Sequence, residues 1–229
     1  MKWNAKFKYP ASTRTYEDGV RKYQFEDKKF PSVTSIISAT KSDEDKAALE
    51  LWKQRVGKIE ANKIKTDASR RGTALHSYLE DYCRGRINDS FFESNEQYKN
   101  MAKVIIENGI KGNLEEIYGM EVSLINQQDK YAGTADLVGI YSGKESIIDF
   151  KQSNKPKKAE FISDYFLQLG AYCLAHDLSH GTNIKTGVIL LCTVDNLFQK
   201  FIIKDAELEI YKNLFLGKVK QFNELKNQS

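Results

Sequence analysis

Two aspartates and one lysine with the potential for metal chemistry lie close together in the second half of the chain. Asp136 belongs to the segment Gly133-Thr134-Ala135-Asp136-Leu137-Val138, and Asp149 and Lys151 end the apolar run Ile147-Ile148-Asp149-Phe150-Lys151. Two carboxylates can hold a divalent cation, which polarises a phosphodiester and lowers the pKa of a bound water, and a lysine can orient that water. The pattern predicts the chemistry of a metal-dependent nuclease.

The spacing of these residues allows them to converge. We expect residues 131–141 and 146–151 to be consecutive antiparallel strands, about 4.8 Å apart, around the turn Ser142-Gly143-Lys144. Residues two apart in a strand share a face, so the aspartate and the lysine of the second strand point the same way. The Asp-x-Lys pattern alone is weak, because Asp27-Lys28-Lys29 also fits it. That copy lies in a polar stretch, which favours the copy in the apolar strand.

A predicted helix upstream carries a third candidate. Within residues 58–83, Gly72, His76 and Glu80 are spaced by four and lie near one another on the helix surface. Leu75, Leu79 and Tyr82 form a separate apolar stripe that can pack on a core. A neutral imidazole is a good ligand for Mn²⁺ or Zn²⁺ and is acceptable for Mg²⁺ beside carboxylates. The alternative is a surface histidine that bonds Glu80.

A second predicted helix, of about residues 157–176, has polar groups along one face. Tyr165, Gln168 and Tyr172 follow helical spacing, so an amide and two phenols could bond phosphate oxygens or stack on unpaired bases. The alternative is an ordinary amphipathic helix with tyrosines at its margin. Lys155 lies just before this helix and would suit a phosphate backbone, although a charge run is usually a solvated face.

The four motifs together resemble the RecB-type branch of the PD-(D/E)XK nuclease superfamily, in which a G-x-x-x-H-x-x-x-E helix, a G-x-x-D strand, D-x-K and a Q-x-x-x-Y helix follow in this order. The segment Phe30-Pro31-Ser32-Val33-Thr34 and a following helix with Trp52 make the chain similar to the mitochondrial genome maintenance exonucleases and their phage relatives over about residues 30–205. The resemblance implies an α/β (α+β mixed) fold, in which a restriction-endonuclease-like mixed sheet is flanked by helices and preceded by a helical lobe.

The resemblance also implies roles for individual residues. His76, Asp136, Asp149 and the Phe150 carbonyl would be metal ligands, and Lys151 would be the catalytic lysine. The other expected site residues are Glu121 as a further acidic catalytic residue, Glu80 in support, and Gln168, Tyr172, Tyr165, Arg70, Arg71 and Lys155 as substrate contacts. The alternative for Glu121 is a solvated edge carboxylate, and burial is favoured over base stacking for Trp52. Mg²⁺ or Mn²⁺ is the expected cofactor, and DNA with a free single-stranded end is the expected substrate.

Length and composition fit this interpretation. One domain of residues 1–229 is expected, with a hairpin and helical lobe in 1–115 and the catalytic sheet with flanking helices in 116–229. A net charge of +4 is too small to indicate nucleic-acid binding by itself. No apolar run approaches the roughly 20 residues that span a bilayer, and no targeting segment is visible, so we expect a cytoplasmic protein of a bacterial or phage-infected cell.

Two cofactors are not expected. The three cysteines, Cys83, Cys173 and Cys192, lack the C-x-x-C spacing of an iron-sulfur site. The chain also lacks a G-x-x-x-x-G-K-[ST] loop, so ATP is not expected either.

Turns and periodicity complete the predicted order of elements. We expect a hairpin around Glu17-Asp18-Gly19, helices from Ser32, over 47–55, 94–109 and 205–226, and strands near 117, 185–193 and 197–203. Two other functions stay open. The same site could belong to a structure-selective or recombination-associated endonuclease, or the chain could be a non-catalytic nucleic-acid-binding module. The intact set of His76, Asp136, Asp149 and Lys151 argues against the second.

Overall fold

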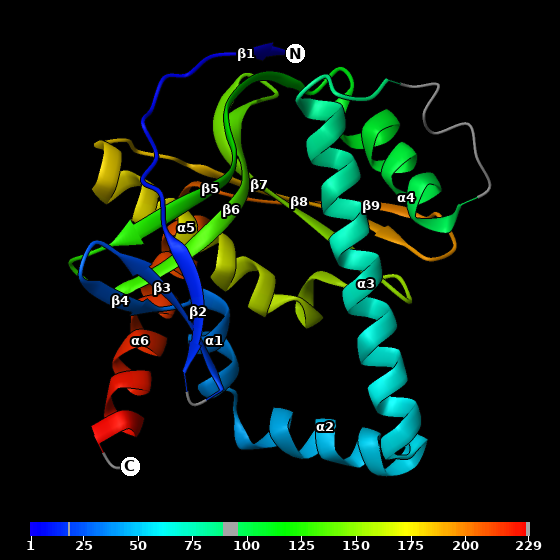
Figure 1. Ribbon diagram of the computed structural model, residues 1–229, viewed down its shortest axis with the longest axis vertical. Helices are drawn as coiled ribbons and strands as arrows, with labels where there is room; N and C mark the ends of the chain where they lie inside the picture. Colours follow the sequence, from blue (N-terminus) through cyan, green and yellow to red (C-terminus); the bar gives the residue numbers. More distant parts are fainter. Residues whose placement is uncertain (18, 89–95, 228–229) are drawn as a thin grey trace.

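A six-stranded mixed β-sheet forms the centre of the computed structural model, which describes residues 1–17, 19–88 and 96–227 (Figure 1). Its strand order is β1-β5-β6-β7-β8-β9. The bounds are β1 (Lys2–Trp3), β5 (Leu114–Asn126), β6 (Tyr131–Tyr141), β7 (Lys144–Ser153), β8 (Thr186–Thr193) and β9 (Phe198–Lys204). The pairs β1–β5 and β7–β8 are parallel and the others antiparallel. With helices on both faces, this architecture confirms the predicted mixed α/β class.

The two faces of the sheet carry separate apolar cores because side chains alternate along each strand. Ile147 and Ile189 face the core beneath α5 (Ser163–His180) and α6 (Asp205–Asn227). Ile148 and Val188 face the core beneath α3 (Lys58–Cys83), α4 (Gln97–Ile105) and the π-helical turn Ile106–Ile110. Every residue of β8 is buried, as expected for a strand with neighbours on both edges and helices on both faces.

The amino-terminal part forms a small three-stranded sheet of β2 (Thr13–Glu17), β3 (Val20–Phe25) and β4 (Lys28–Pro31). The strands of the predicted hairpin pair with one another, although residue 18 lies outside the described residues. β4 was not predicted. A bridge between Ser32 and Ala132 joins the end of β4 to β6, so the small sheet is connected to the central sheet.

Serine side chains cap the first two helices. Ser32 accepts a hydrogen bond from the Ser35 N–H at the start of α1 (Val33–Ala39), and Ser42 accepts one from the Asp45 N–H at the start of α2 (Asp43–Val56). Such bonds satisfy backbone donors that have no partner inside the helix. The helix predicted over 94–109 is observed as α4 from Gln97 onward. The first two residues of that prediction lie outside the described residues.

The predicted bounds of the Gln168 helix were wrong at both ends. α5 begins at Ser163, after a 3₁₀ turn at Ala159–Phe161, and ends at His180. The backbone N–H of Lys157 donates to Gln199 Oε1, and Gln199 Nε2 donates to the Lys157 carbonyl. These bonds to β9 hold the backbone of Lys157 in a connection that is not helical.

Helices α2 and α3 extend away from the sheet. They meet at Gly57, whose φ of +83° favours glycine, and α2 lies at the end of α3 far from the sheet (Figure 1). None of the residues of α2 is buried, and Trp52 is half-buried against a hollow shared with α3. The division of the chain at residue 115 stays a prediction. No helix in the described part of the chain is both long and apolar enough to cross a bilayer.

The three cysteines are free thiols buried in three different places. Cys83 ends α3, Cys173 lies within α5, and Cys192 lies in β8. Burial raises the pKa of the Cys83 and Cys192 thiols to about 12 and raises that of Cys173 as well. Each thiol therefore stays protonated in the folded protein at neutral pH.

Candidate active site

The two aspartates meet where the pairing between β6 and β7 ends. The register runs to Leu137 opposite Ile148, which leaves Asp136 and Asp149 as the next residues of the two strands. There the Phe150 N–H donates to Asp136 Oδ2 at 2.7 Å in place of a strand partner. Both aspartates are buried. The end of the β6–β7 ladder thus fixes two carboxylates side by side, as the sequence predicted.

Lys151 connects the aspartates to α5. Its Nζ forms an ion pair with Asp149 Oδ2 and donates to Gln168 Oε1 at 3.1 Å. Gln168 Nε2 in turn donates to the Tyr172 hydroxyl at 2.9 Å, and the Tyr165 ring lies 5.2 Å from the lysine Nζ. The predicted helix face and the predicted strand triad are therefore in direct contact.

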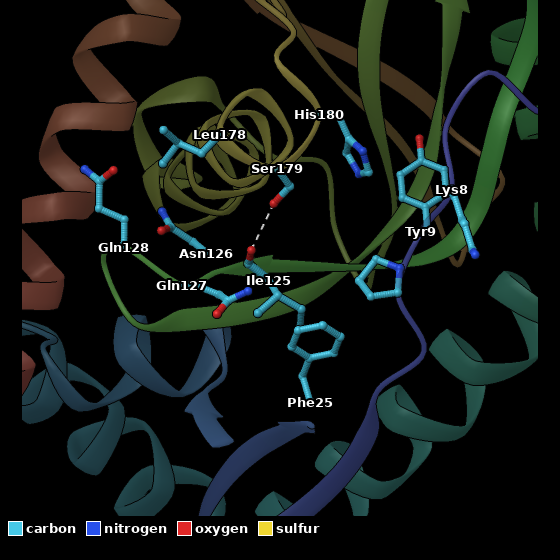
Figure 2. Close-up of a pocket in the computed structure, with 11 residues that line it drawn as sticks. Lys8, Tyr9, Phe25, Ile125, Asn126, Gln127, Gln128, Leu178, Ser179 and His180 are labelled. Carbon is cyan, nitrogen blue, oxygen red and sulfur yellow. Dashed lines mark hydrogen bonds between the residues drawn. The ribbon is translucent and has the colours of Figure 1, made fainter. Parts of the chain in front are cut away.

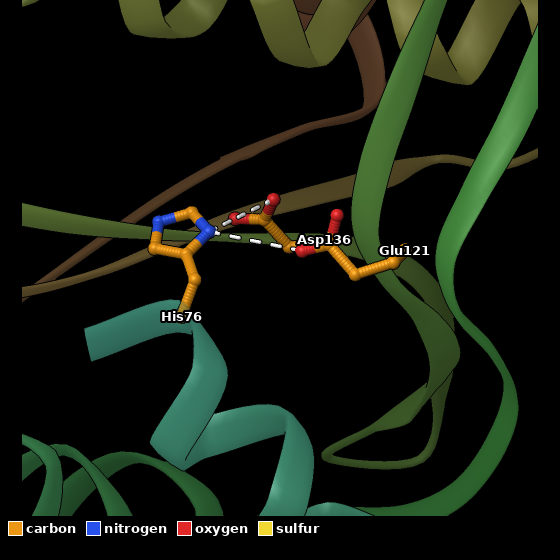
Figure 3. Close-up of side chains that lie close together, drawn as sticks. All are labelled: His76, Glu121 and Asp136. Carbon is orange, nitrogen blue, oxygen red and sulfur yellow. Dashed lines mark ion pairs between the residues drawn. The ribbon is translucent and has the colours of Figure 1, made fainter. Parts of the chain in front are cut away.

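His76 reaches the same place from α3 (Figure 3). Its Nε2 lies 2.9 Å from the Phe150 carbonyl oxygen, and its Nδ1 lies 3.4 Å from Asp136 Oδ1 and 3.8 Å from Glu121 Oε1. In the neutral form, Nε2–H donates to the carbonyl and Nδ1 is left with a lone pair, the arrangement typical of a metal-bound histidine. Burial lowers the pKa of His76, but the charge and hydrogen bonding of Asp136, together with Glu121, outweigh burial and raise that pKa well above its usual value.

Glu121 has an unusual backbone conformation. Its φ of +51° lies in the left-handed region, between the pairs Met120–Leu137 and Val122–Ala135. Such a conformation is uncommon outside glycine and costs about 1–3 kcal/mol. The carboxylate of Glu121 extends from β5 toward His76 and Asp136 (Figure 3). Strain of this kind at a cluster of charged side chains favours a functional role over a solvated edge carboxylate.

The donor set fits a divalent cation. Ligand atoms of His76, Glu121 and Asp136 all lie within 4.8 Å of one another. Asp149 Oδ1 is buried and has no hydrogen-bond partner among the described residues. Burial, together with the charge of Asp136, raises the pKa of Asp149 to about 6 despite the ion pair with Lys151. Carboxylates and one imidazole suit Mg²⁺ or Mn²⁺, and a cation would compensate this excess of negative charge. The Phe150 carbonyl, also a predicted ligand, accepts from His76 here.

A cavity of about 180 Å³ lies over these groups, and its other wall was not predicted. It is lined by Arg14, Arg21, Tyr23, Ser32, Val33, Thr34, His76, Glu121, Gly133, Thr134, Asp136, Asp149, Lys151, Gln168 and Tyr172. Arg14 pairs across the hairpin with Tyr23, and the Tyr23 hydroxyl lies 3.1 Å from Thr134 Oγ1 of β6. Arg14 and Arg21 have no carboxylate partner among the described residues. The hairpin therefore adds two guanidinium groups to an acidic cavity.

Two predicted contributors lie elsewhere. Arg71 is buried, and its guanidinium donates to Gln152 and Asn154, so it joins α3 to the end of β7 and to the residue that follows this strand. Glu80 pairs with Arg84 at 2.6 Å, whereas His76 bonds Phe150, Asp136 and Glu121 within the described part of the chain, which argues against the alternative of a His76–Glu80 bond. Neither residue lines the cavity.

Arg70 and Lys155 also lie outside the cavity. Arg70 is exposed on α3 and lines a separate hollow with polar residues of that helix. Lys155 is exposed in the connection after β7. Their predicted contacts with substrate stay predictions.

A larger cavity, of about 590 Å³, shares no lining residue with the cavity of the charged cluster, and Figure 2 shows its side chains. It is lined by Lys8, Tyr9, Pro10, Phe25, Ile125, Asn126, Gln127, Gln128, Leu178, Ser179 and His180. The Ser179 hydroxyl donates to the Ile125 carbonyl at 2.9 Å, as Figure 2 shows. This lining contains no carboxylate, so the metal chemistry belongs to the smaller cavity.

Comparison with known proteins agrees with the resemblance inferred from the motifs. No family model matches the chain. It is 27% identical over 213 residues to mitochondrial genome maintenance exonuclease 1 of Homo sapiens, covering 86% of this chain and 59% of that protein. It is 27% identical over 172 residues to the Mus musculus protein of the same name, covering 72% and 50%. The chain thus spans between half and three fifths of the length of these relatives.

A solved structure from Eubacterium rectale, provisionally named an exonuclease, overlaps 70% of this chain and 68% of its own, with a TM-score of 0.47 and 13% identity. The similarity to proteins named mitochondrial genome maintenance exonuclease 1 rests on the sequence comparison alone and is consistent with a PD-(D/E)XK-like exonuclease.

Proposed function

We propose that this chain is a divalent-metal-dependent exonuclease that hydrolyses phosphodiester bonds of single-stranded DNA from a free end, in DNA replication, repair or degradation in a bacterial or phage-infected cell. The observation that carries the proposal is the cavity in which His76, Glu121, Asp136 and Asp149 converge beside Lys151. The names of the curated homologues support an exonuclease.

His76, Glu121, Asp136 and Asp149 would hold the cation. When bound, a divalent cation polarises a phosphodiester and makes water a better nucleophile at neutral pH. Lys151 acts beside it as a fixed positive charge. Burial would lower the pKa of Lys151, but the carboxylates of Asp149 and Asp136 outweigh burial and raise it. The ammonium group can therefore orient the attacking water and stabilise negative charge that develops on the phosphate.

Gln168 and Tyr172 have a positioning role in this proposal. Gln168 Oε1 accepts from Lys151 Nζ, and the amide nitrogen of Gln168 donates to the buried Tyr172 hydroxyl. This chain of bonds limits the positions that the lysine can take. It keeps the ammonium group over the aspartates while substrate enters.

Arg14 and Arg21 are the proposed phosphate contacts. They lie on the hairpin side of the cavity and lack carboxylate partners within the described residues. Arg21 Nε donates to the neutral Tyr16 hydroxyl, at 3.2 Å. A guanidinium group binds phosphate oxygens well. The small volume of the cavity, enclosed by the hairpin, α3 and α5, favours one strand over a duplex.

A cleavage assay tests this function. Linear single strands labelled at either end, a closed single-stranded circle and a duplex are incubated with Mg²⁺ or Mn²⁺, with and without chelator. We expect degradation of the linear strand, persistence of the circle, weak activity on duplex and none in chelator. Rapid cutting of the circle would indicate an endonuclease. Cleavage in excess chelator would refute the metal site, and binding without cleavage under all conditions would leave only a binding module.

A further inference from the structure

A second hollow, lined by residues that adjoin those of the nuclease cavity in the sequence, has only basic side chains among its charged groups. It measures about 400 Å³ and is lined by Lys28, Lys29, Phe30, Pro31, Gln127, Lys130, Asn223 and Lys226. The lining thus contains four lysines and two amides and no carboxylate. We call this hollow, with Lys28, Lys29, Lys130 and Lys226 in its lining, the lysine groove. It brings together β4, the β5–β6 turn and the end of α6.

The positive charge of the lysine groove is poorly compensated. Within the described ranges, only Lys29 has a carboxylate partner, Glu17, and that carboxylate also pairs with Lys22 at 2.6 Å. Burial lowers the pKa of Lys226, and the positive charge of Lys22 lowers it further. Like charges gathered in this way repel one another, so an anion in the groove would relieve them.

The lysine groove and the nuclease cavity are lined by residues that follow one another at two points of the chain. Pro31 lines the groove, and the next residues, Ser32, Val33 and Thr34, line the cavity. Lys130 likewise lies just before β6, whose Thr134 lines the cavity. Four residues of extended chain span about 13 Å. A strand that occupies the cavity therefore has a short path to the lysines.

We propose that the lysine groove binds backbone phosphates of the nucleic-acid strand at positions outside the scissile bond. This inference rests on the proposed function. Phe30, the aromatic residue of the lining, is buried and cannot stack on a base. Binding is therefore electrostatic and independent of base sequence, and it weakens as salt rises. The groove holds long strands while the cavity holds the phosphate to be cleaved.

The experiment compares two triple variants that change net charge equally. The test variant carries Lys28→Gln, Lys130→Gln and Lys226→Gln. The control carries Lys103→Gln, Lys144→Gln and Lys204→Gln, at exposed lysines that line neither the groove nor the nuclease cavity. Binding of labelled single-stranded DNA is measured in chelator over a range of salt concentrations, with strands of about 4 and about 20 nucleotides.

We expect the test variant to lose at least about tenfold in affinity for the long strand, and its salt slope to fall by about 2, because each lost contact with a single strand removes about 0.7. Affinity for the short strand, and both affinities of the control, stay near those of the wild-type protein. If the test variant and the control have the same affinity for the long strand, the lysine groove does not bind phosphates. Cleavage by the wild-type protein would still support the proposed function in that case. Wild-type protein that binds neither strand overturns both.

Discussion

Lys151 is held between an acidic residue and an amide, and this position suggests that it contributes to the rate rather than to affinity. We expect Lys151→Met to bind single-stranded DNA nearly normally in chelator, while single-turnover cleavage falls by about 10²–10⁴, the usual range for loss of a catalytic proton-transfer or charge-stabilising group. Lys144→Met, at an exposed lysine at the other end of β7 that does not line the cavity, is the control and should keep wild-type cleavage. Normal cleavage by Lys151→Met would remove the lysine from the mechanism.

Asp136 should decide whether the protein binds a cation. Asparagine retains an oxygen that can accept from the Phe150 N–H but removes the charge, so Asp136→Asn should fold and lose the metal site. We expect Mn²⁺ to raise the melting temperature of the wild-type protein through preferential binding to the folded state, and to leave that of Asp136→Asn unchanged. Glu224→Gln, at an exposed carboxylate of α6, should respond like wild type. An equal shift in Asp136→Asn would argue against this ligand set.

Residues could be assigned to the site from the sequence where they belong to one short motif. Asp149 and Lys151 are two apart in one strand, so periodicity alone puts them on one face. Arg14 and Arg21 were missed because more than a hundred residues separate them from the aspartates, and the contact between Tyr23 and Thr134 brings them to the cavity. The left-handed backbone of Glu121 was equally hidden, since no residue pattern specifies a positive φ at a glutamate.

At the scale of elements, the approach of β6 to α5 depends on a missing side chain. A Cβ built at Gly133 would lie 2.4 Å from Cε1 of Tyr172, whose ring is buried. We expect Gly133→Ala to displace this ring and to lower the free energy of unfolding by about 1–3 kcal/mol. The same displacement disturbs Gln168, so cleavage should fall as well.

A second glycine provides the control for that prediction. Gly217 lies within α6, where an added Cβ meets nothing within 4 Å, so Gly217→Ala should stabilise the protein by up to about 1 kcal/mol. Unfolding of both variants in denaturant, fitted with one common dependence of the free energy on denaturant concentration, shows whether stability falls in Gly133→Ala and rises in Gly217→Ala. Equal stability of the two variants would mean that β6 and α5 are not in close contact.

Elements with strong patterns were predicted well, and short polar ones were not. The apolar run expected at 185–193 is β8, Thr186–Thr193. β1 has two residues, and β4 begins with two exposed lysines, so neither has an alternation that the sequence could reveal. Both exist because a neighbouring strand offers backbone partners, which is a tertiary effect.

At the scale of the whole molecule, the amino-terminal segment packs on the far end of α5. The Tyr9 hydroxyl lies 3.1 Å from His176 Nε2, and Thr182 Oγ1 lies 2.8 Å from His176 Nδ1. The Phe7 ring lies edge-on to the same imidazole, and His180 lies beside it. His176 is fully buried, so this joint between the amino-terminal segment and α5 contains an uncharged imidazole.

This joint makes stability depend on pH. Burial, with the charge of His180 adding to it, lowers the pKa of His176 to about 4, whereas an unfolded histidine has a pKa of about 6.5. Between these values the unfolded chain binds more protons, so stability is retained above pH 6.5 and is lost as pH falls toward 4, by up to about 3 kcal/mol. The free energy of unfolding, measured across this pH range, should change more steeply with pH for the wild-type protein than for His176→Gln. Parallel profiles would exclude His176 as the source.

The rate at which the three buried thiols are labelled reports how often each region of the fold opens. Alkylating reagents react with the thiolate, which the raised pKa values of Cys83, Cys173 and Cys192 suppress while the chain is folded. Each thiol belongs to a different element: the end of α3, the middle of α5 and the central strand β8. Mass spectrometry of labelled peptides would therefore follow three regions at once and rank them by their free energies of opening, without introducing any probe into the protein.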